Sequence, residues 1–216
     1  MGGKDDPFDL ENFSWPRPGA KLFQADKPLS PPAFLDSGPR QWWMYAESYR
    51  FAATTLVERF HATGHDQDFL SLPVLYLYRH YAELSLKYLA RESNRFLGLK
   101  PPKLNHKLMP LWSSVESALT KIWPERYGED HAAVGQLIQQ LAAVDPRSDT
   151  FRFPVDKKGA PHLPDELKRF DLVHFATEME SFAHWVGGVA DALSAESDVK
   201  ADMDVMYREA TADSGP

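Results

Sequence analysis

The sequence has no cysteine among its 216 residues. Disulfide bonds, thiolate zinc sites and a cysteine nucleophile are therefore excluded. No apolar run approaches the length of a membrane span, and the first ten residues, MGGKDDPFDL, have no apolar core of a secretion signal. We expect a soluble protein of the cytoplasm without a membrane partner.

Basic charge and familiar catalytic motifs are also scarce. Lys and Arg number 24 against 31 Asp and Glu, so the formal net charge is −7. This argues against nonspecific coating of nucleic acid, although a small local site stays open. Glycine-rich phosphate loops and the HExxH and GxSxG motifs are missing. His61 and His65 are four residues apart and Asp66 follows the second of them, but no further metal ligand is evident, so we expect no metal and no cofactor.

Residues 1–40 are rich in proline, which rules out helix and disfavours strand pairing. The same segment keeps more large aromatic residues than a purely disordered tail does. We therefore predict an extended arm that lies over the rest of the chain or over a partner subunit, pinned by its rings. Those rings are Phe8, Phe13, Trp15, Phe23 and Phe34.

Residues 41–194 show the apolar spacing of amphipathic helices, which predicts an all-α fold, an antiparallel bundle of four to five helices. Between the last two helices, Asp145–His162 is expected to form a small hairpin or flap. Gly187 and Gly188 lie inside the last helix, where close helix packing or a kink would explain them. Residues 195–216 are expected to form an acidic polar tail with a short helix near Val199–Arg208. The helices predicted in the bundle are Gln41–His61, Leu72–Ala90, Lys107–Ile122, His131–Val144 and Pro164–Leu193.

The stretch Leu72–Ala90 is the element around which we expect the others to pack. It is strongly apolar, yet it carries Arg79, His80, Glu83 and Lys87 in its middle. Arg79 with Glu83, and Glu83 with Lys87, are i,i+4 pairs that stabilise a helix. One interpretation is a solvated face. The other is a polar groove inside the bundle, which requires the stretch to be a core helix with its charges facing protein.

One further pattern, Arg126-x4-His131, suits metal-free RNA cleavage. The imidazole can take or give the proton of a 2′-hydroxyl, and the guanidinium can hold the phosphate. Gly128 interrupts any continuous helix between the two residues. The alternative is that Arg126 is an exposed loop cation and that His131 lies in the first turn of a helix.

Two more residues are candidates for the same polar centre. His106 begins a helix beside Asn105, after the rigid Pro101-Pro102 pair. Arg152 lies between two phenylalanines, and in a strand it would point opposite to both. Each residue either lines a site or is structural, in which case Arg152 reaches Glu83 as a salt bridge.

Four pieces of the sequence together resemble a known family. They are AESYRFAATTLVE, LYLYRHYAELSLKYL, NHKLMPLW and an FRFP segment before the last helix. Over residues 41–193 this pattern is similar to bacterial HEPN-like domains, small all-helical proteins of toxin–antitoxin and defence loci. The resemblance implies an antiparallel bundle that forms a homodimer. Active members are metal-independent ribonucleases with an Arg-x4-His motif at the dimer interface.

In this chain only Arg126 and His131 match that motif, so the resemblance assigns them as the catalytic pair. Tyr127 and Gly128 depart from it, since the family usually has a polar residue after the arginine and a continuous helix. Two functions follow: an enzyme acting on RNA or nucleotides, or a non-catalytic module that binds a partner protein or small ligand or oligomerises. In either case the residues expected to bind are Arg79, His80, Glu83, Lys87, His106 and Arg152.

Overall fold

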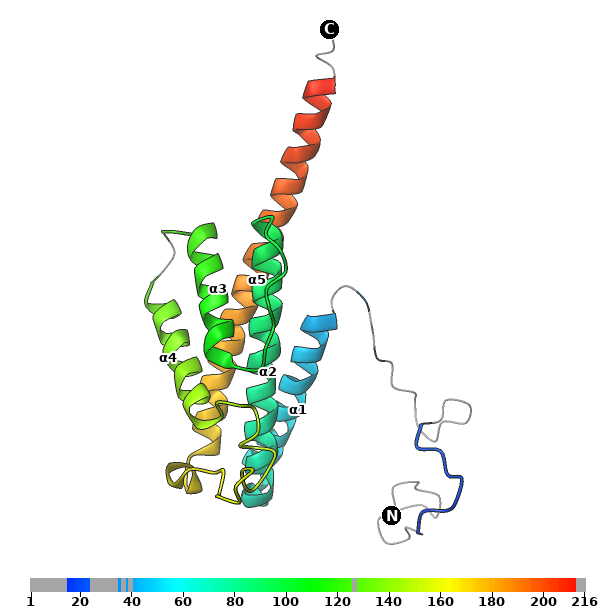
Figure 1. Cartoon of the computed structure of the whole chain (residues 1–216), viewed down its shortest axis with the longest axis vertical. Coiled ribbons are helices and arrows are strands. Elements are labelled where there is room, and N and C mark those ends of the chain that lie inside the picture. Colours follow the sequence, from blue (N-terminus) through cyan, green and yellow to red (C-terminus); the bar gives the residue numbers. More distant parts are fainter. Residues whose placement is uncertain (1–14, 24–34, 36–37, 39–40, 126–127, 213–216) are drawn as a thin grey trace. The chain divides into compact units, whose positions relative to one another are not determined.

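A computed structural model describes residues 15–23, 35, 38, 41–125 and 128–212 (Figure 1). The chain divides into two units, Met1–Ser37 and Gly38–Pro216. In the first unit, Trp15 and Phe23 are 91% and 90% exposed in the single chain, and the expectation that such rings pin the arm stays a prediction. Phe8, Phe13 and Phe34 lie outside the described residues.

The second unit is all-α, as predicted, and no strand occurs in its described residues. Five α-helices pack together, with one short 3₁₀ helix, η1, before the last of them. Each expected helix is present, although several are longer than the apolar spacing alone indicated. The elements are α1 (Gln41–Thr63), α2 (Gln67–Phe96), α3 (Leu108–Ile122), α4 (Glu129–Val144), η1 (Asp165–Lys168) and α5 (Leu172–Ala212).

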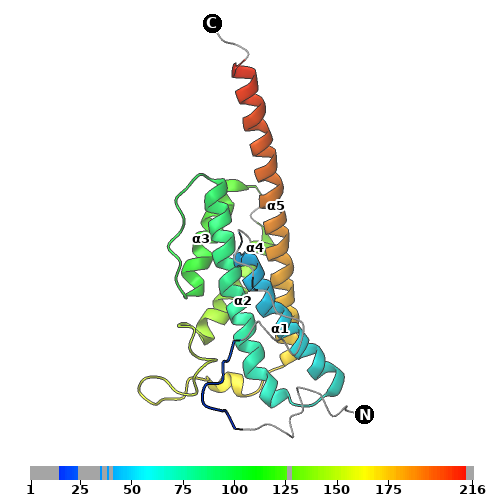
Figure 2. The same ribbon diagram turned by 90° about the vertical axis from the view of Figure 1, so that its right-hand side faces the viewer.

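Helix α2 lies at the centre and packs against α1, α3 and α5, while α4 packs on α3 (Figure 2). Its side chains at Tyr78, Leu86 and Leu89 have no exposed surface. The facing helix α1 buries only Ala46 and Ala53, small residues that let it lie close to α2. The predicted core helix wrapped by three others is therefore confirmed.

The start of α2 differs from the expectation. The helix begins at Gln67, so Pro73 lies beyond its first turn rather than in it. Asp66 is the N-cap residue, but its backbone is left-handed, with φ 65°, and its side chain makes no capping hydrogen bond. Phe69 and Leu72 are exposed here, so water can reach the Phe69 carbonyl, which Pro73 leaves without a donor.

The segment between α4 and α5 contains the predicted hairpin in a reduced form. Val155 and Pro161 form a single antiparallel bridge. Between them, the Asp156 carboxylate accepts hydrogen bonds from the backbone N–H groups of Lys158 and Ala160, at 2.8 and 2.9 Å. A side-chain carboxylate thus holds this turn closed.

Helix α5 begins later and ends later than predicted. Pro164 precedes η1, and the N-terminus of α5 is capped instead by Asp171, whose carboxylate accepts from the N–H groups of Val173 and His174. The helix then continues through Ser194 to Ala212, so the short helix expected in the tail is part of it.

The two glycines inside α5 do not mark a close helix contact. A Cβ atom built at Gly187 or Gly188 would meet no atom within 4 Å. The explanation by close packing is therefore wrong, and nothing in the structure requires glycine at either position.

Candidate functional site

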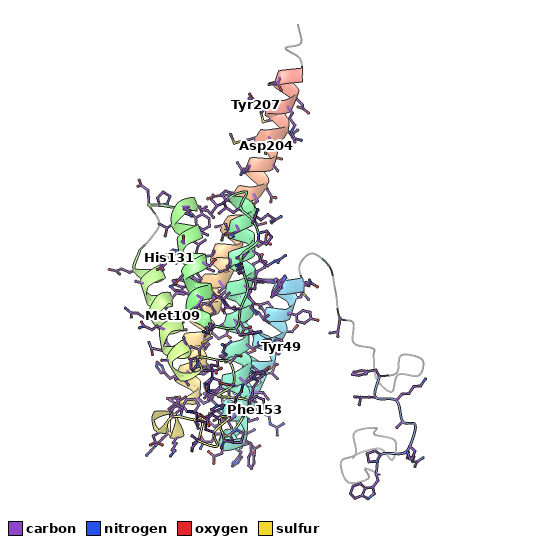
Figure 3. All side chains as sticks on the ribbon, viewed as in Figure 1. Tyr49, Met109, His131, Phe153, Asp204 and Tyr207 are labelled. Carbon is purple, nitrogen blue, oxygen red and sulfur yellow. The ribbon has the colours of Figure 1, made fainter. Side chains whose placement is uncertain are left out.

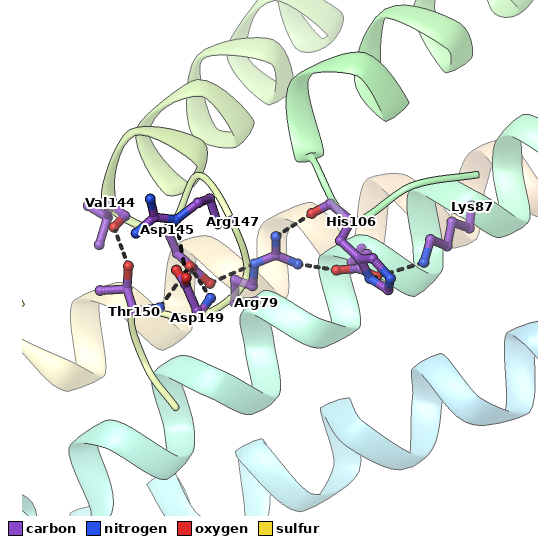
Figure 4. Close-up of polar contacts among 9 residues, drawn as sticks. Arg79, Lys87, His106, Val144, Asp145, Arg147, Asp149 and Thr150 are labelled. Atoms are coloured by element: carbon purple, nitrogen blue, oxygen red, sulfur yellow. Dashed lines mark hydrogen bonds and ion pairs between the residues drawn. The ribbon is translucent and has the colours of Figure 1, made fainter. Parts of the chain in front are cut away.

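The charged side chains in the middle of α2 lie inside the bundle (Figure 4). The side chains of Arg79, Glu83 and Lys87 are 0%, 1% and 9% exposed. The interpretation as a solvated face is therefore wrong, because these charges face protein, while the polar groove itself stays a prediction. Buried charges are costly unless each is paired and hydrogen-bonded, so their partners decide what the site can do.

Glu83 is the centre of this cluster and contacts three nitrogen groups. Its Oε1 accepts a hydrogen bond from Lys87 Nζ at 2.6 Å and lies 2.8 Å from His106 Nδ1. Its Oε2 accepts from Arg79 Nη1. Both carboxylate oxygens are therefore engaged, although water scarcely reaches them.

These contacts decide the protonation state of Glu83. Burial by itself raises the pKa of this carboxyl, but the hydrogen bond and charge of Lys87, the charge of Arg79 and the hydrogen bond of His106 lower it, and the net pKa lies below its ordinary value. Glu83 is thus ionised at neutral pH and can only accept hydrogen bonds.

Because Glu83 is ionised, it also fixes the tautomer of His106. Because Oε1 is an acceptor, the proton of the neutral imidazole must be on Nδ1, which leaves Nε2 as the acceptor. The side chain of His106 is 74% exposed, unlike the carboxylate that holds it. The pair therefore presents an oriented imidazole to solvent, an arrangement that suits general acid–base chemistry.

Arg79 ties this pair to two other parts of the chain. Its Nη2 donates to the backbone carbonyl of His106 at 2.7 Å. Its Nε lies 2.9 Å from Asp145 Oδ2, a close ion pair rather than an aligned hydrogen bond. Asp145 Oδ1 in turn accepts from the N–H groups of Asp149 and Thr150, at 2.8 and 3.0 Å. One guanidinium thus joins α2 to the segment before α3 and to the turn after α4.

A basic strip leads to His106 along residues 97–107, which connect α2 to α3. Lys100, Lys103 and Lys107 are exposed, and this stretch contains no acidic residue. None of the three forms an ion pair with a residue that the structure describes. In a chain of net charge −7, this local excess of positive charge next to an exposed imidazole favours an anionic ligand.

His80 is separate from this hydrogen-bonded cluster. It is half-buried, with the ring of Tyr49 edge-on at 4.4 Å and the ring of Tyr76 stacked at 5.8 Å. Burial lowers its pKa, although the charge of Glu83 opposes that change. The neutral form of His80 is therefore favoured by its place between α1 and α2.

Arg152 does not join the polar centre. It is exposed, and its guanidinium lies 5.5 Å from the ring centre of Phe153. The expected salt bridge to Glu83 is not formed, since the cations at that carboxylate are Arg79 and Lys87. The expected strand is absent as well, because residues 151 and 152 form a turn.

The Arg-x4-His pattern is described only at its histidine end. Arg126 and Tyr127 lie outside the described residues. His131 is in the first turn of α4 (Figure 3). It is half-buried, with its ring edge-on to that of Trp185 and the ring centres 5.6 Å apart. Gly128 is the N-cap of α4 and is extended, with φ −131° and ψ −165°. The expected break in the helix between the two motif residues is therefore confirmed.

Two sets of polar contacts in the structure were not predicted from the sequence. Asp145 follows the last apolar residue of α4, and nothing in its neighbours indicates a partner on α2. Arg50 of α1 donates to Glu180 of α5 at 2.7 and 2.9 Å, and Tyr78 donates to the same carboxylate at 2.9 Å. Burial and this hydrogen bond raise the pKa of Tyr78. Such long-range pairs leave no periodic signal.

The described residues were compared with the arrangements that metal sites and membrane-spanning helices require. Within the described ranges, no group of three or more His, Asp or Glu side chains is placed to hold a metal ion. None of the described helices combines the length and apolar character that a membrane span needs. Comparison of the chain with protein families, curated proteins and solved structures finds no match.

Proposed function

We propose that the protein acts on RNA or nucleotides as a metal-independent ribonuclease, with His106 as the group that moves the proton. The observation that carries the proposal is the Glu83–His106 pair, a buried carboxylate at 2.8 Å from the Nδ1 of an exposed imidazole. Supporting it are the basic strip of residues 97–107 and the resemblance of residues 41–193 to HEPN-like domains, which suggests a role in bacterial defence or stress.

In this proposal His106 Nε2 accepts the proton of a 2′-hydroxyl, and the resulting oxygen attacks the adjacent phosphorus. The bond to the 5′-oxygen breaks, that oxygen takes a proton from a solvent water molecule, and the products are a 2′,3′-cyclic phosphate and a 5′-hydroxyl. The imidazolium of His106 returns its proton to solvent. Glu83 is a positioning residue, which holds the ring and stabilises the imidazolium. Lys103 and Lys107 supply positive charge for the phosphates.

The experiment measures cleavage of a labelled single-stranded RNA by the whole protein in the presence of EDTA. We expect a 2′,3′-cyclic end, and we expect His106→Ala to lower the rate by about 100-fold or more. His131→Ala is the matched comparison, since the resemblance assigns Arg126 and His131 to catalysis. Loss of activity only in His131→Ala would place the chemistry at that motif instead.

The second candidate function is a non-catalytic module that binds a partner or oligomerises. The same structure offers one observation for it, because Arg79, Glu83 and Lys87 are balanced by one another and by Asp145 inside the bundle. A network whose charges balance in this way can have a purely structural role, without a ligand or a reaction. No RNA cleavage by the unaltered protein, with and without added Mg²⁺, would refute the ribonuclease and favour the module.

A further inference from the structure

A groove runs between α4 and α5, apart from the Glu83–His106 pair. Its volume is about 600 Å³, and it extends from Asp130 to Gln140 on α4 and from His174 to Trp185 on α5. A second hollow of about 320 Å³ shares His184 and Trp185 with it and continues along α5 to Ala192. Over that stretch of α5 the two together are about 27 Å long.

The floor of the groove is apolar and aromatic. Val134 and Phe182 are buried in it, and Leu137 is half-buried. Trp185 is half-buried too, packed parallel to Phe182 with ring centres 6.3 Å apart. Trp123 lines the second hollow. Indole faces next to apolar side chains can hold both the aliphatic stem and the charged end of a Lys or Arg.

The charged residues at the rim of the groove indicate which charge a ligand should carry. Asp130 and Glu178 line the groove and are exposed, and no Lys or Arg is among its described lining residues. The other titratable groups there are His131, His174 and His184. A ligand that is basic and partly apolar would therefore complement this surface, whereas an acidic one would be repelled.

The walls of the groove decide the conformation of the occupant. Both walls are helices, whose backbone groups are already paired within the helix, so an extended peptide would find no sheet edge to bond with. A helix satisfies its own backbone and can lay one apolar face into such a groove. A length of about 27 Å fits a helix of about 18 residues.

We propose that the α4/α5 groove binds a basic amphipathic helix of a partner protein. The apolar face of that helix lies on Leu137 and Trp185, and its Lys or Arg side chains pair with Asp130 and Glu178. The proposal goes beyond RNA cleavage and does not depend on it, since neither Glu83 nor His106 lines the groove.

The test uses a fluorescent 18-residue peptide with leucine on one face and lysine on the other, and a partner peptide with glutamate in place of lysine. Binding to the whole protein is followed by fluorescence anisotropy at about 0.15 M salt, where distant surface charges are screened. We expect the lysine peptide to bind and the glutamate peptide not to bind. The double variant D130K/E178K should weaken binding by about tenfold or more.

The matched control is Asp191→Lys, which reverses an exposed charge on α5 outside both hollows. It should leave the affinity nearly unchanged. Hydrogen exchange adds a second measurement, since bound peptide should slow exchange on α4. Equal weakening by Asp191→Lys, or no added protection on α4, would overturn the proposal. So would a dimer that is broken by D130K/E178K, because a second copy would then fill the groove.

Discussion

The substitution Glu83→Gln gives the sharpest test of the buried network. It keeps the shape of the side chain but removes the negative charge at its centre. Arg79 retains Asp145 and the carbonyl of His106, whereas Lys87 loses the carboxylate it donates to at 2.6 Å. A nearly buried ammonium group would then be left uncompensated.

The size of the effect follows from that imbalance. Breaking a buried ion pair by removing one partner typically costs about 3–5 kcal/mol. The side chain of Lys87 is 9% exposed, so it can move partly toward water, and we expect the lower end, about 3 kcal/mol. For a chain of this length that corresponds to a fall in Tm of roughly 6–12 °C.

The assay is urea unfolding followed by tryptophan fluorescence and circular dichroism, with the slope of the transition checked for constancy. Glu47→Gln is the matched control, since Glu47 also pairs with an arginine but both side chains are about one-third exposed. It should cost about 1 kcal/mol or less. Lys87→Met added to Glu83→Gln should recover part of the loss. If Glu83→Gln cost no more than Glu47→Gln, the network would not be the dry, charge-balanced cluster described above.

Two further predictions concern single positions. Burial holds the pKa of His80 below its ordinary value of 6.5, so the unfolded chain takes up this proton first and stability is lost as the pH falls below 6.5. His80→Phe should reduce that loss, as measured by urea unfolding between pH 7.5 and 5.5 (about one unit on either side of that value); parallel curves for both proteins would contradict it. Gly188→Ala should stabilise α5 by about 0.5–1 kcal/mol, because open space surrounds the new methyl group. Gly135→Ala should give no such gain in Tm, since its methyl would lie 3.1 Å from Trp112 Nε1.

The helices could be predicted because local spacing determines them. The apolar repeat in Leu72–Ala90 indicated a core helix, and its two i,i+4 charge pairs are formed. The ends were harder to predict. Helix α5 continues to Ala212 without a break, where the sequence indicated only a separate short helix near Val199–Arg208. Pro164 indicated where the last helix begins, but α5 begins at Leu172, after Asp171, whose carboxylate caps it.

The site could be predicted only in part, for a related reason. Glu83 and Lys87 are one helical turn apart, so their contact follows from sequence. The partners Asp145 and His106 come from other elements and depend on how the bundle packs. The expected salt bridge between Arg152 and Glu83 was wrong for the same reason. Which cation pairs with a buried carboxylate depends on how the bundle packs, and the sequence does not show this.

The position of Arg79 also bears on how the molecule assembles. Its guanidinium bonds to residue 106, 27 positions away, and to residue 145, further still along the chain. Until both segments have docked, withdrawing this cation from water is unfavourable. We therefore expect the cluster to close late in folding, so that removing one of its partners should raise the unfolding rate more than it lowers the folding rate.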